Sequence, residues 1–353
     1  FLSYDLGRVT ERIPRIARRD LPFPDLWLAF FDHGLAWDVR ASRWRGFFLE
    51  GAPARPDARR RLAALVRSIE RGEAPGGEPA PGRARASIPR AEYLRAVRRI
   101  RDYIAAGDVF QVNFAHRFEA DAPGDPRRHW SRLRSFSPAP FGAYLRTQDG
   151  AVLSISPESF LRVRFDFVET RPIKGTRPRG AAPAADRALA RRLEASPKDR
   201  AELRMIVDLE RNDLGRVCRY GSVKVRTEGV LETHPTVFHR AAIVEGRLRP
   251  DASLADLLRA TFPGGSVTGA PKIRAMEIIE ELEPVRRSVY TGAIGAFSFC
   301  GDADLSVAIR TALWARGRAF YSAGGGIVAD SDPEAEYQET LDKARAFIEA
   351  MGD

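Results

Sequence analysis

The sequence predicts an α+β fold, on three observations. Apolar and polar residues alternate over 160–167, which places Leu161, Val163, Phe165 and Phe167 on one face of a strand. Apolar residues recur at helical spacing over 90–106, which predicts an amphipathic helix. Strand-like and helix-like segments of this kind follow one another along 353 residues, a length that can bury a substantial core in one large or two average domains.

The first 84 residues are expected to form a region of their own. Aromatic and polar residues alternate within 1–50, which predicts strands of a sheet, and a short helix is expected over 57–71. Residues 73–85 contain Gly-Gly and Pro-Gly and favour a flexible loop. We therefore expect an N-terminal sheet region, 1–84, and a core, 85–353, that form one globular unit. Because the chain begins with Phe, we expect its first region to be truncated.

The segment after the helix at 90–106 predicts a strand with two different faces. Phe110, Val112, Phe114 and Phe118 fall on one face. Gln111 and Asn113 fall on the other face, together with a small residue. A polar amide among small residues, opposite an aromatic face, suits a lined cavity as well as an exposed surface.

An unusual lysine follows the strand at 160–167. The segment 169–180 contains two prolines and two glycines and predicts a tight turn, with Lys174 inside it. Arg171, Arg177 and Arg179 surround Lys174 in the sequence. Nearby positive charge and partial burial both favour the neutral, nucleophilic amine. The alternative is an ordinary solvated loop lysine.

Two helices each carry a pair of carboxylates near their first turn. Ser196 as N-cap and Pro197 at the first helical position begin a helix over 197–214, which presents Asp199 and Glu202. Asp332-Pro333 opens the last helix, where Glu336 and Glu339 are again three residues apart. Such acidic residues commonly complement the helix dipole. Two such ends could together hold Mg²⁺, which takes oxygen ligands.

Further strands and helices carry other polar candidates. Residues 136–168 read as strands with Glu158 at a turn, and 223–248 as strands that carry His239, which alone is more often structural than catalytic. Helices are expected over 254–260 and 271–282. The alternation over 305–313 predicts a hairpin in which Arg310 lies among small residues, well placed to bind a carboxylate with its guanidinium.

Composition narrows the class of protein. The chain has 57 Lys+Arg against 47 Asp+Glu and a net charge of +10, which suggests nucleic acid or an anionic ligand. The arginines are spread along the chain, which favours a compositional bias over a nucleic-acid-binding face. Two cysteines without metal-like spacing fit a reducing compartment, so we expect a cytoplasmic protein. No apolar run approaches the ~20 residues of a membrane span.

Many short motifs resemble, in order, those of the chorismate-utilising enzyme family. They are Asp108-Val109-Phe110-Gln111-Val112-Asn113, Ser156-Pro157-Glu158, Pro172-Ile173-Lys174-Gly175-Thr176, Ser196-Pro197-Lys198-Asp199-Arg200-Ala201-Glu202, Asp208-Leu209-Glu210-Arg211-Asn212-Asp213, Gly269-Ala270-Pro271-Lys272, Tyr290-Thr291-Gly292-Ala293-Ile294-Gly295, Ala308-Ile309-Arg310-Thr311, Gly324-Gly325-Gly326 and Glu336-Tyr337-Gln338-Glu339-Thr340. The resemblance covers 85–353 strongly and 4–8 weakly. It implies two large, mainly antiparallel β-sheets packed face to face, with helices outside and the site between them.

The resemblance also implies roles for individual residues. It makes Lys174 a covalent nucleophile, Glu158 the general acid, and Gln111 the counterpart of a water-activating lysine in isochorismate-forming relatives. His239 would lie beside the substrate. Residues that would bind the substrate are Gly175, Thr176, Tyr290, Arg310, Gly324, Gly325 and Gly326. Glu202 and Glu339 would bind Mg²⁺ directly, with Asp199 and Glu336 further out around it.

The activity implied by the lysine motif is conversion of chorismate and ammonia to 4-amino-4-deoxychorismate, for p-aminobenzoate and folate. A separate glutamine amidotransferase would supply the ammonia. The nearest alternative is anthranilate synthesis, in which the corresponding turn usually reads Pro-Ile-Ala-Gly-Thr. An isochorismate or salicylate synthase is disfavoured by Gln111, because an amide nitrogen is not a base. A nucleic-acid-binding protein has no motif in its favour.

Overall fold

The computed structural model describes residues 1–51, 57–72, 82–234 and 237–351. Its contacts divide the chain into two compact units, Phe1–Leu26 with Pro79–Asp353, and Trp27–Glu78. Residues 1–26 therefore group with the expected core and not with the rest of 1–84. Most of the loop expected over 73–85 lies outside the described residues. No helix of the described part of the chain is both long enough and apolar enough to cross a membrane.

The N-terminal segment is attached to the larger unit by specific contacts. Leu2 forms an antiparallel bridge with Ala293. The carboxylate of Asp5 accepts a hydrogen bond from the backbone N–H of Ser288 at 3.0 Å. Arg8 forms an ion pair with the buried Glu280. These contacts explain why residues 1–26 belong with the core.

The smaller unit contains one hairpin and one helix. Strands β1 (His33–Asp38) and β2 (Arg43–Phe48) pair antiparallel, and α2 (Ala58–Glu70) packs on both. Strands are thus present within 1–50, as expected, although residues 27–32 form none, and the helix expected over 57–71 is confirmed.

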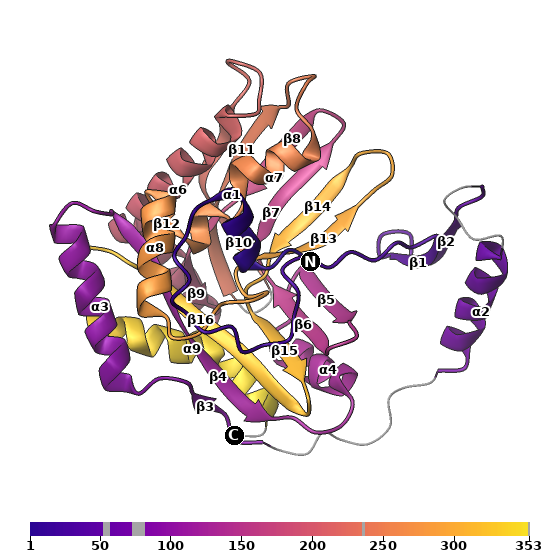
Figure 1. Ribbon diagram of the computed structural model, residues 1–353, viewed down its shortest axis with the longest axis horizontal. Helices are drawn as coiled ribbons and strands as arrows, with labels where there is room; N and C mark the ends of the chain where they lie inside the picture. The colour runs from indigo at the N-terminus through magenta and orange to yellow at the C-terminus, as the bar shows by residue number, and fades with distance from the viewer. Residues whose placement is uncertain (52–56, 73–81, 235–236, 352–353) are drawn as a thin grey trace. The chain divides into compact units, whose positions relative to one another are not determined.

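The larger unit contains two large antiparallel sheets, which confirms the predicted fold class (Figure 1). The described strands of the first sheet are β7 (Ser159–Arg164), β8 (Phe167–Arg171), β9 (Ile173–Pro178), β10 (Lys224–Thr233), β11 (Val237–Arg247), β13 (Ala293–Phe297) and β14 (Ala303–Val307). They are ordered β10-β11-β8-β7-β14-β13, and β9 pairs with β11. Helices α5 (Pro183–Ala195) and α6 (Pro197–Gly215) pack on this sheet, and α7 (Leu254–Thr261) packs on α6.

The second sheet is ordered β12-β4-β16-β15-β6-β5, with β3 paired to β4. Its described strands are β3 (Arg85–Ala86), β4 (Gln111–Asp121), β5 (Phe141–Arg146), β6 (Ala151–Ser156), β12 (Gly269–Ala270), β15 (Thr311–Ala315) and β16 (Arg318–Ile327). Helices α3 (Arg90–Ala105), α4 (Pro126–Phe136), α8 (Lys272–Leu282) and α9 (Pro333–Met351) pack against it. Figure 1 shows α3 and α9 on the side of β4 and β16. Short helical segments complete the order: η1 (Tyr4–Leu6), α1 (Gly7–Thr10) and η2 (Gly265–Val267).

The chain crosses from one sheet to the other at two neighbouring places. Strand β6 passes into β7 through Pro157-Glu158, and β14 passes into β15 through residues 308–310. The two crossovers are tied together, since the N–H of Val307 donates to the carbonyl of Glu158 at 3.0 Å. The expected hairpin is present, since β14 pairs with β13, but the alternation expected over 305–313 is not continuous, because β14 ends at Val307 and β15 begins at Thr311 in the other sheet. Arg310 has a φ of 48°, a left-handed conformation that ends the alternation there.

Two other expectations also fail in the first sheet. Phe165 is 88% exposed with a φ of 54°, because the chain turns there between β7 and β8 instead of continuing as one strand. Lys174 lies within strand β9 and not in a tight turn. The predicted start of α6 is confirmed, since the Ser196 hydroxyl accepts a hydrogen bond from the N–H of Asp199 at 3.3 Å.

Candidate active site

Lys174 contacts the segment that follows helix α7. Its Nζ donates a hydrogen bond to the carbonyl oxygen of Ser266 at 3.2 Å. Its charge favours the ionised form of three carboxylates, those of Glu158, Glu202 and Glu339, although burial raises the pKa of the first two overall. The lysine thus faces acidic groups that come from a sheet crossover and from two helices.

The arginines near Lys174 in the sequence have other partners. Arg171 pairs with Glu232 at 2.6 Å, and Arg177 with Asp199 at 3.0 Å. Arg179 pairs with Asp186 at 2.6 Å. The positive charge expected around Lys174 is therefore compensated by these three carboxylates.

Glu158 is buried at the first crossover, with 5% of its surface exposed. Burial raises the pKa of its carboxyl group, although a hydrogen bond from Ser266 and the charge of Lys174 act in the opposite direction. The raised pKa expected for a general acid is thus present. Ser266 contacts both Glu158 and Lys174, which brings the two groups into one environment.

His239 lies opposite Thr176 in the β11–β9 pair. Its Nδ1 and the Thr176 hydroxyl are 2.9 Å apart. Burial, with smaller contributions from Arg310 and His234, lowers the pKa of His239 to about 3. The imidazole is therefore neutral near neutral pH, and Thr176 fixes its orientation. A neutral His239 can position a substrate but supplies no charge.

Because the glycines of β16 have no side chains, residues of β4 and α9 approach this strand closely. Gly324, Gly325 and Gly326 pair with β4. A Cβ on Gly326 would lie 2.8 Å from Nε2 of Gln111, and one on Gly325 would lie 3.0 Å from Oε2 of Glu336. Gly325 therefore makes room for Glu336 and Glu339, and Gly326 makes room for Gln111, whereas Gly324 lies against Phe114 and Ala115 of β4.

Gln111 has no exposed surface, and neither its Nε2 nor its Oε1 has a hydrogen-bond partner among the described residues. An unpaired buried amide is unfavourable unless something else binds it. The exposed-surface alternative for this face of β4 is therefore excluded. The second alternative, a lined cavity, agrees with the burial of Gln111.

The four carboxylates of the predicted metal site influence one another. Lys198 Nζ is 3.9 Å from Glu202 Oε1 and 3.6 Å from Glu336 Oε1. Glu339 interacts electrostatically with both Glu202 and Glu336. Asp199 also acts on Glu202 and forms the ion pair with Arg177. The described residues contain no ready-made group of three metal-binding side chains.

The charges of these carboxylates are partly compensated by lysines. Burial raises the pKa of Glu202 and of Glu336. Burial also acts to raise the pKa of Glu339, but nearby lysines lower it overall. The nearest is Lys343, whose Nζ is 2.6 Å from Oε1 of Glu339. An all-oxygen set whose members repel one another suits a hard divalent cation, so the donor chemistry fits Mg²⁺.

Arg310 and Tyr290 are the two remaining side chains that the sequence predicts to bind the substrate. In the described part of the chain no carboxylate lies within 4.0 Å of the Arg310 guanidinium, although its charge acts on His239 and Tyr321. Tyr290 is buried, with its ring 5.9 Å from the guanidinium carbon of Arg287. Arg310 therefore offers a positive charge that no side chain of the described residues neutralises.

The sequence reasoning missed Ser266, Lys198 and Lys343. The sequence did contain a signal for the two lysines. Lys198 is four residues before Glu202 and Lys343 is four residues after Glu339, a spacing that brings side chains together on a helix. No local signal marks Ser266, because its contacts are with residues far away in the sequence.

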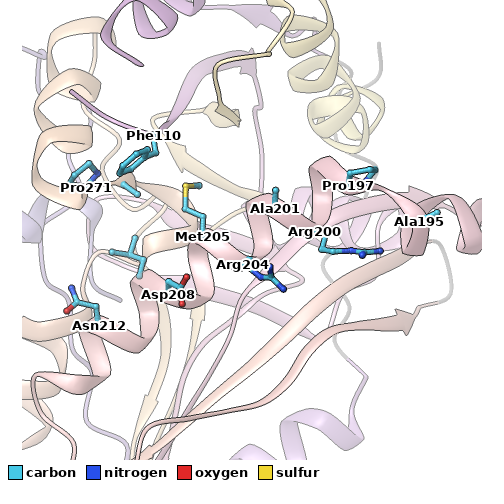
Figure 2. A pocket seen from close by; sticks show the side chains of 12 residues that line it. Phe110, Ala195, Pro197, Arg200, Ala201, Arg204, Met205, Asp208, Asn212 and Pro271 are labelled. Carbon is cyan, nitrogen blue, oxygen red and sulfur yellow. The ribbon is translucent and has the colours of Figure 1, made fainter. Parts of the chain in front are cut away.

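A separate groove of about 710 Å³ runs along the outer side of α6. Figure 2 shows Phe110 and Pro271 on one side of it and Met205 of α6 on the other. Phe110 is 71% exposed there, whereas Val112, Phe114 and Phe118, expected on the same face, are buried. None of the predicted site residues lines this groove.

The chain was compared with known families, proteins and structures. Residues 1–349 match the family described as chorismate binding enzyme. "Aminodeoxychorismate synthase component 1" of Salmonella typhimurium is 45% identical over 99% of this chain and 75% of its own length. "Anthranilate synthase component 1" of Thermus thermophilus is 42% identical over 99% of this chain and 76% of its own length. The crystal structure of anthranilate synthase component I from Streptococcus pneumoniae superposes with a TM-score of 0.88 at 34% identity, covering 99% of this chain and 79% of that one.

Proposed function

The chain belongs to the chorismate-binding enzyme family, and we propose that it converts chorismate and ammonia to 4-amino-4-deoxychorismate. Relatives named for this activity are 43–46% identical over 99% of the chain. The observation that carries the proposal is the shared environment of Lys174 and Glu158, since Ser266 contacts both. A nucleophile beside a buried acid is what displacement of a ring hydroxyl requires.

In the first step the Lys174 amine forms a bond to C2 of chorismate, the two ring double bonds shift from C1=C2 and C5=C6 to C1=C6 and C4=C5, and the C4–O bond breaks. Glu158 donates its proton to the departing hydroxyl, which leaves as water. In the second step ammonia forms a bond to C4, both ring double bonds shift back, and the C2–N bond to Lys174 breaks. The proton released from the new ammonium group returns to Glu158, so the overall change is chorismate plus ammonia to product plus water.

The first step needs a neutral Lys174 and a protonated Glu158 at the same time. One proton transfer from the Lys174 ammonium to the Glu158 carboxylate produces both forms. Burial of Glu158 favours its protonated form. A bound substrate that excludes water would favour the neutral pair further, because separated charges are costly in a medium of low dielectric constant.

Gln111 supports ammonia rather than water as the final nucleophile. Its amide is buried and unpaired among the described residues, and it cannot accept a proton as a general base. Its Oε1 can accept a hydrogen bond from the ammonia N–H groups. Ammonia is itself nucleophilic and needs orientation but no base, whereas water needs one.

Glu202 and Glu339 would hold Mg²⁺, with Glu336 and Asp199 around it. When bound, the ion would neutralise a carboxylate of the substrate. Lys198 and Lys343 now contact these carboxylates, so their ammonium groups would exchange places with the metal. Arg310 would bind a carboxylate of the same substrate through its guanidinium.

Ammonia would come from a partner protein. The name "component 1" of the relatives implies a second component, and we take it to be a glutamine amidotransferase. The purified chain should then use ammonium salts alone and use glutamine only after addition of that partner. Activity with glutamine in the absence of any partner would contradict this assignment.

Anthranilate formation is the alternative, favoured by the 42% identity to the Thermus thermophilus relative and by the 0.88 TM-score to the Streptococcus pneumoniae structure. The two reactions differ in whether pyruvate is released. Incubation of the chain with chorismate, Mg²⁺ and an ammonium salt, followed by assay of pyruvate, separates them.

A further inference from the structure

A second cavity, of about 280 Å³, lies at the far end of β4 from the candidate active site. Its charged lining consists of Arg18, Arg85, Arg117 and Arg318 with one carboxylate, that of Glu119. Arg117 is six residues from Gln111 along β4, which corresponds to about 20 Å in an extended strand. The cavity is therefore separate from the groups assigned to catalysis.

The single carboxylate is already fully engaged. Arg117 donates from Nε to Glu119 Oε1 at 3.1 Å, and Arg318 donates from Nη2 to Glu119 Oε2 at 2.8 Å. Arg117 also forms a bidentate pair with Asp20. Its side chain is 6% exposed, so its position in the wall is fixed by these contacts.

Two arginines of the cavity lack such a partner. Arg85 lies directly opposite Glu119 in the β3–β4 pair, but in the described part of the chain no carboxylate lies within 4.0 Å of Arg85 or of Arg18. The backbone of Arg18 is held in place by hydrogen bonds with Pro284 and Arg286. Two guanidinium groups thus converge on one cavity with no side chain to neutralise them.

The cavity also offers a hydroxyl group. The Oγ of Ser87 accepts the backbone N–H of Arg117 at 3.2 Å, which leaves its O–H able to donate. Planar guanidinium groups match the geometry of phosphate oxygens and bind them through paired hydrogen bonds. The volume accommodates a phosphate group that carries a small organic substituent.

From this convergence of uncompensated arginines on a preformed cavity, we propose that the chain has a second anion site, formed by Arg18, Arg85, Arg318 and Ser87, for phosphate or a small phosphate monoester. The site does not depend on the reaction proposed above, because it shares no residue with that site.

Isothermal titration calorimetry with inorganic phosphate, at constant ionic strength, tests the proposal. We expect saturable binding to the wild-type chain. The double variant Arg18→Gln, Arg85→Gln should bind phosphate about 100-fold more weakly, because each charge-assisted interaction that is removed accounts for about 10-fold in affinity. The matched control is Arg95→Gln, Arg98→Gln, which removes the same charge from two exposed residues of α3 and should bind like the wild type.

Two further variants make the result specific. Glu119→Gln removes the only carboxylate of the lining and should tighten phosphate binding. Arg310→Gln should leave phosphate affinity unchanged, whatever it does to turnover of chorismate.

Two outcomes would overturn the proposal. If Arg310→Gln lost phosphate binding while the Arg18, Arg85 double variant retained it, phosphate would bind in the candidate active site. Equal weakening in the control pair, or no saturation, would show only general attraction to a basic chain and would also overturn it. Titration with glycerol 3-phosphate and with glycerol shows whether the organic substituent adds affinity.

Discussion

Lys174 Nζ lies 3.2 Å from the carbonyl oxygen of Ser266, and through this residue the lysine is linked to the buried carboxyl group of Glu158. The two groups come from different elements, β9 and the crossover between β6 and β7. In the proposed reaction this arrangement would let one proton pass from Lys174 to Glu158 before the lysine attacks.

We predict that Lys174→Ala lowers turnover of chorismate with ammonia on the order of 10⁴-fold, the scale seen when a group that takes part in bond formation is removed. Lys224→Ala, a change at an exposed strand lysine, is the control and should be fully active. Acid quenching of the wild type during turnover, followed by peptide mass spectrometry, should find chorismate minus water attached to the peptide that contains Lys174. Full activity of Lys174→Ala would exclude covalent catalysis.

Gly326→Ala is predicted to displace Gln111. The new Cβ would lie 2.8 Å from Nε2 of this fully buried side chain, in a packed environment where overpacking costs about 1–3 kcal/mol. We expect the variant to melt at a lower temperature than the wild type. We also expect its KM for ammonia to increase by a larger factor than its KM for chorismate. Gly215→Ala is the control, since a Cβ there has no atom within 4 Å and should leave both quantities unchanged. An unaltered KM for ammonia would remove Gln111 from the ammonia site.

The pH dependence of stability is predicted to include a contribution from Glu210. Burial, opposed by a hydrogen bond from Thr170, raises the pKa of Glu210 to about 8. Between its ordinary value of 4.5 and about 8 the folded chain holds a proton that the unfolded chain has lost, so stability falls as pH rises through this window. Glu210→Gln keeps the acceptor for Thr170 and should melt at a higher temperature than the wild type at pH 8 but at a similar temperature at pH 4. An equal difference at both pH values would contradict this assignment.

Removal of a predicted metal ligand should weaken metal dependence. We expect Glu202→Gln to raise the Mg²⁺ concentration for half-maximal turnover by about 10-fold or more, and to weaken Mg²⁺ binding measured by calorimetry by the same factor. Glu334→Gln is the control, because this residue lies in the first turn of α9 but pairs with Arg90 at the surface. Equal Mg²⁺ requirements in the two variants would remove Glu202 from the metal site.

The elements predicted best from sequence were those with a local cause. Ser196 as cap and Pro197 at the first position define the start of α6 by themselves, and the structure shows the expected hydrogen bond. The helix expected over 90–106 likewise follows from its own apolar spacing. The sequence could not decide whether the face of β4 that carries Gln111 is buried or exposed. Its burial depends on the glycines of β16, which lie more than 200 residues away in the sequence.

The crossovers show where local reasoning fails. The alternation through Val307, Ile309 and Leu313 places these residues on one face of the predicted hairpin, yet Arg310 has a positive φ and the chain passes to another sheet there. The charges around Lys174 likewise could not be predicted from the neighbouring sequence. Its neighbours in sequence are arginines, whereas the carboxylates that act on it come from distant elements.

Mass spectrometry of the products from chorismate, Mg²⁺ and an ammonium salt, with no amidotransferase present, tests the central claim most directly. We expect a product in which one hydroxyl is replaced by an amine and the enolpyruvyl group is retained, with no release of pyruvate. Anthranilate together with an equal amount of pyruvate would contradict the proposed reaction and leave the position of Lys174 beside Glu158 without a role.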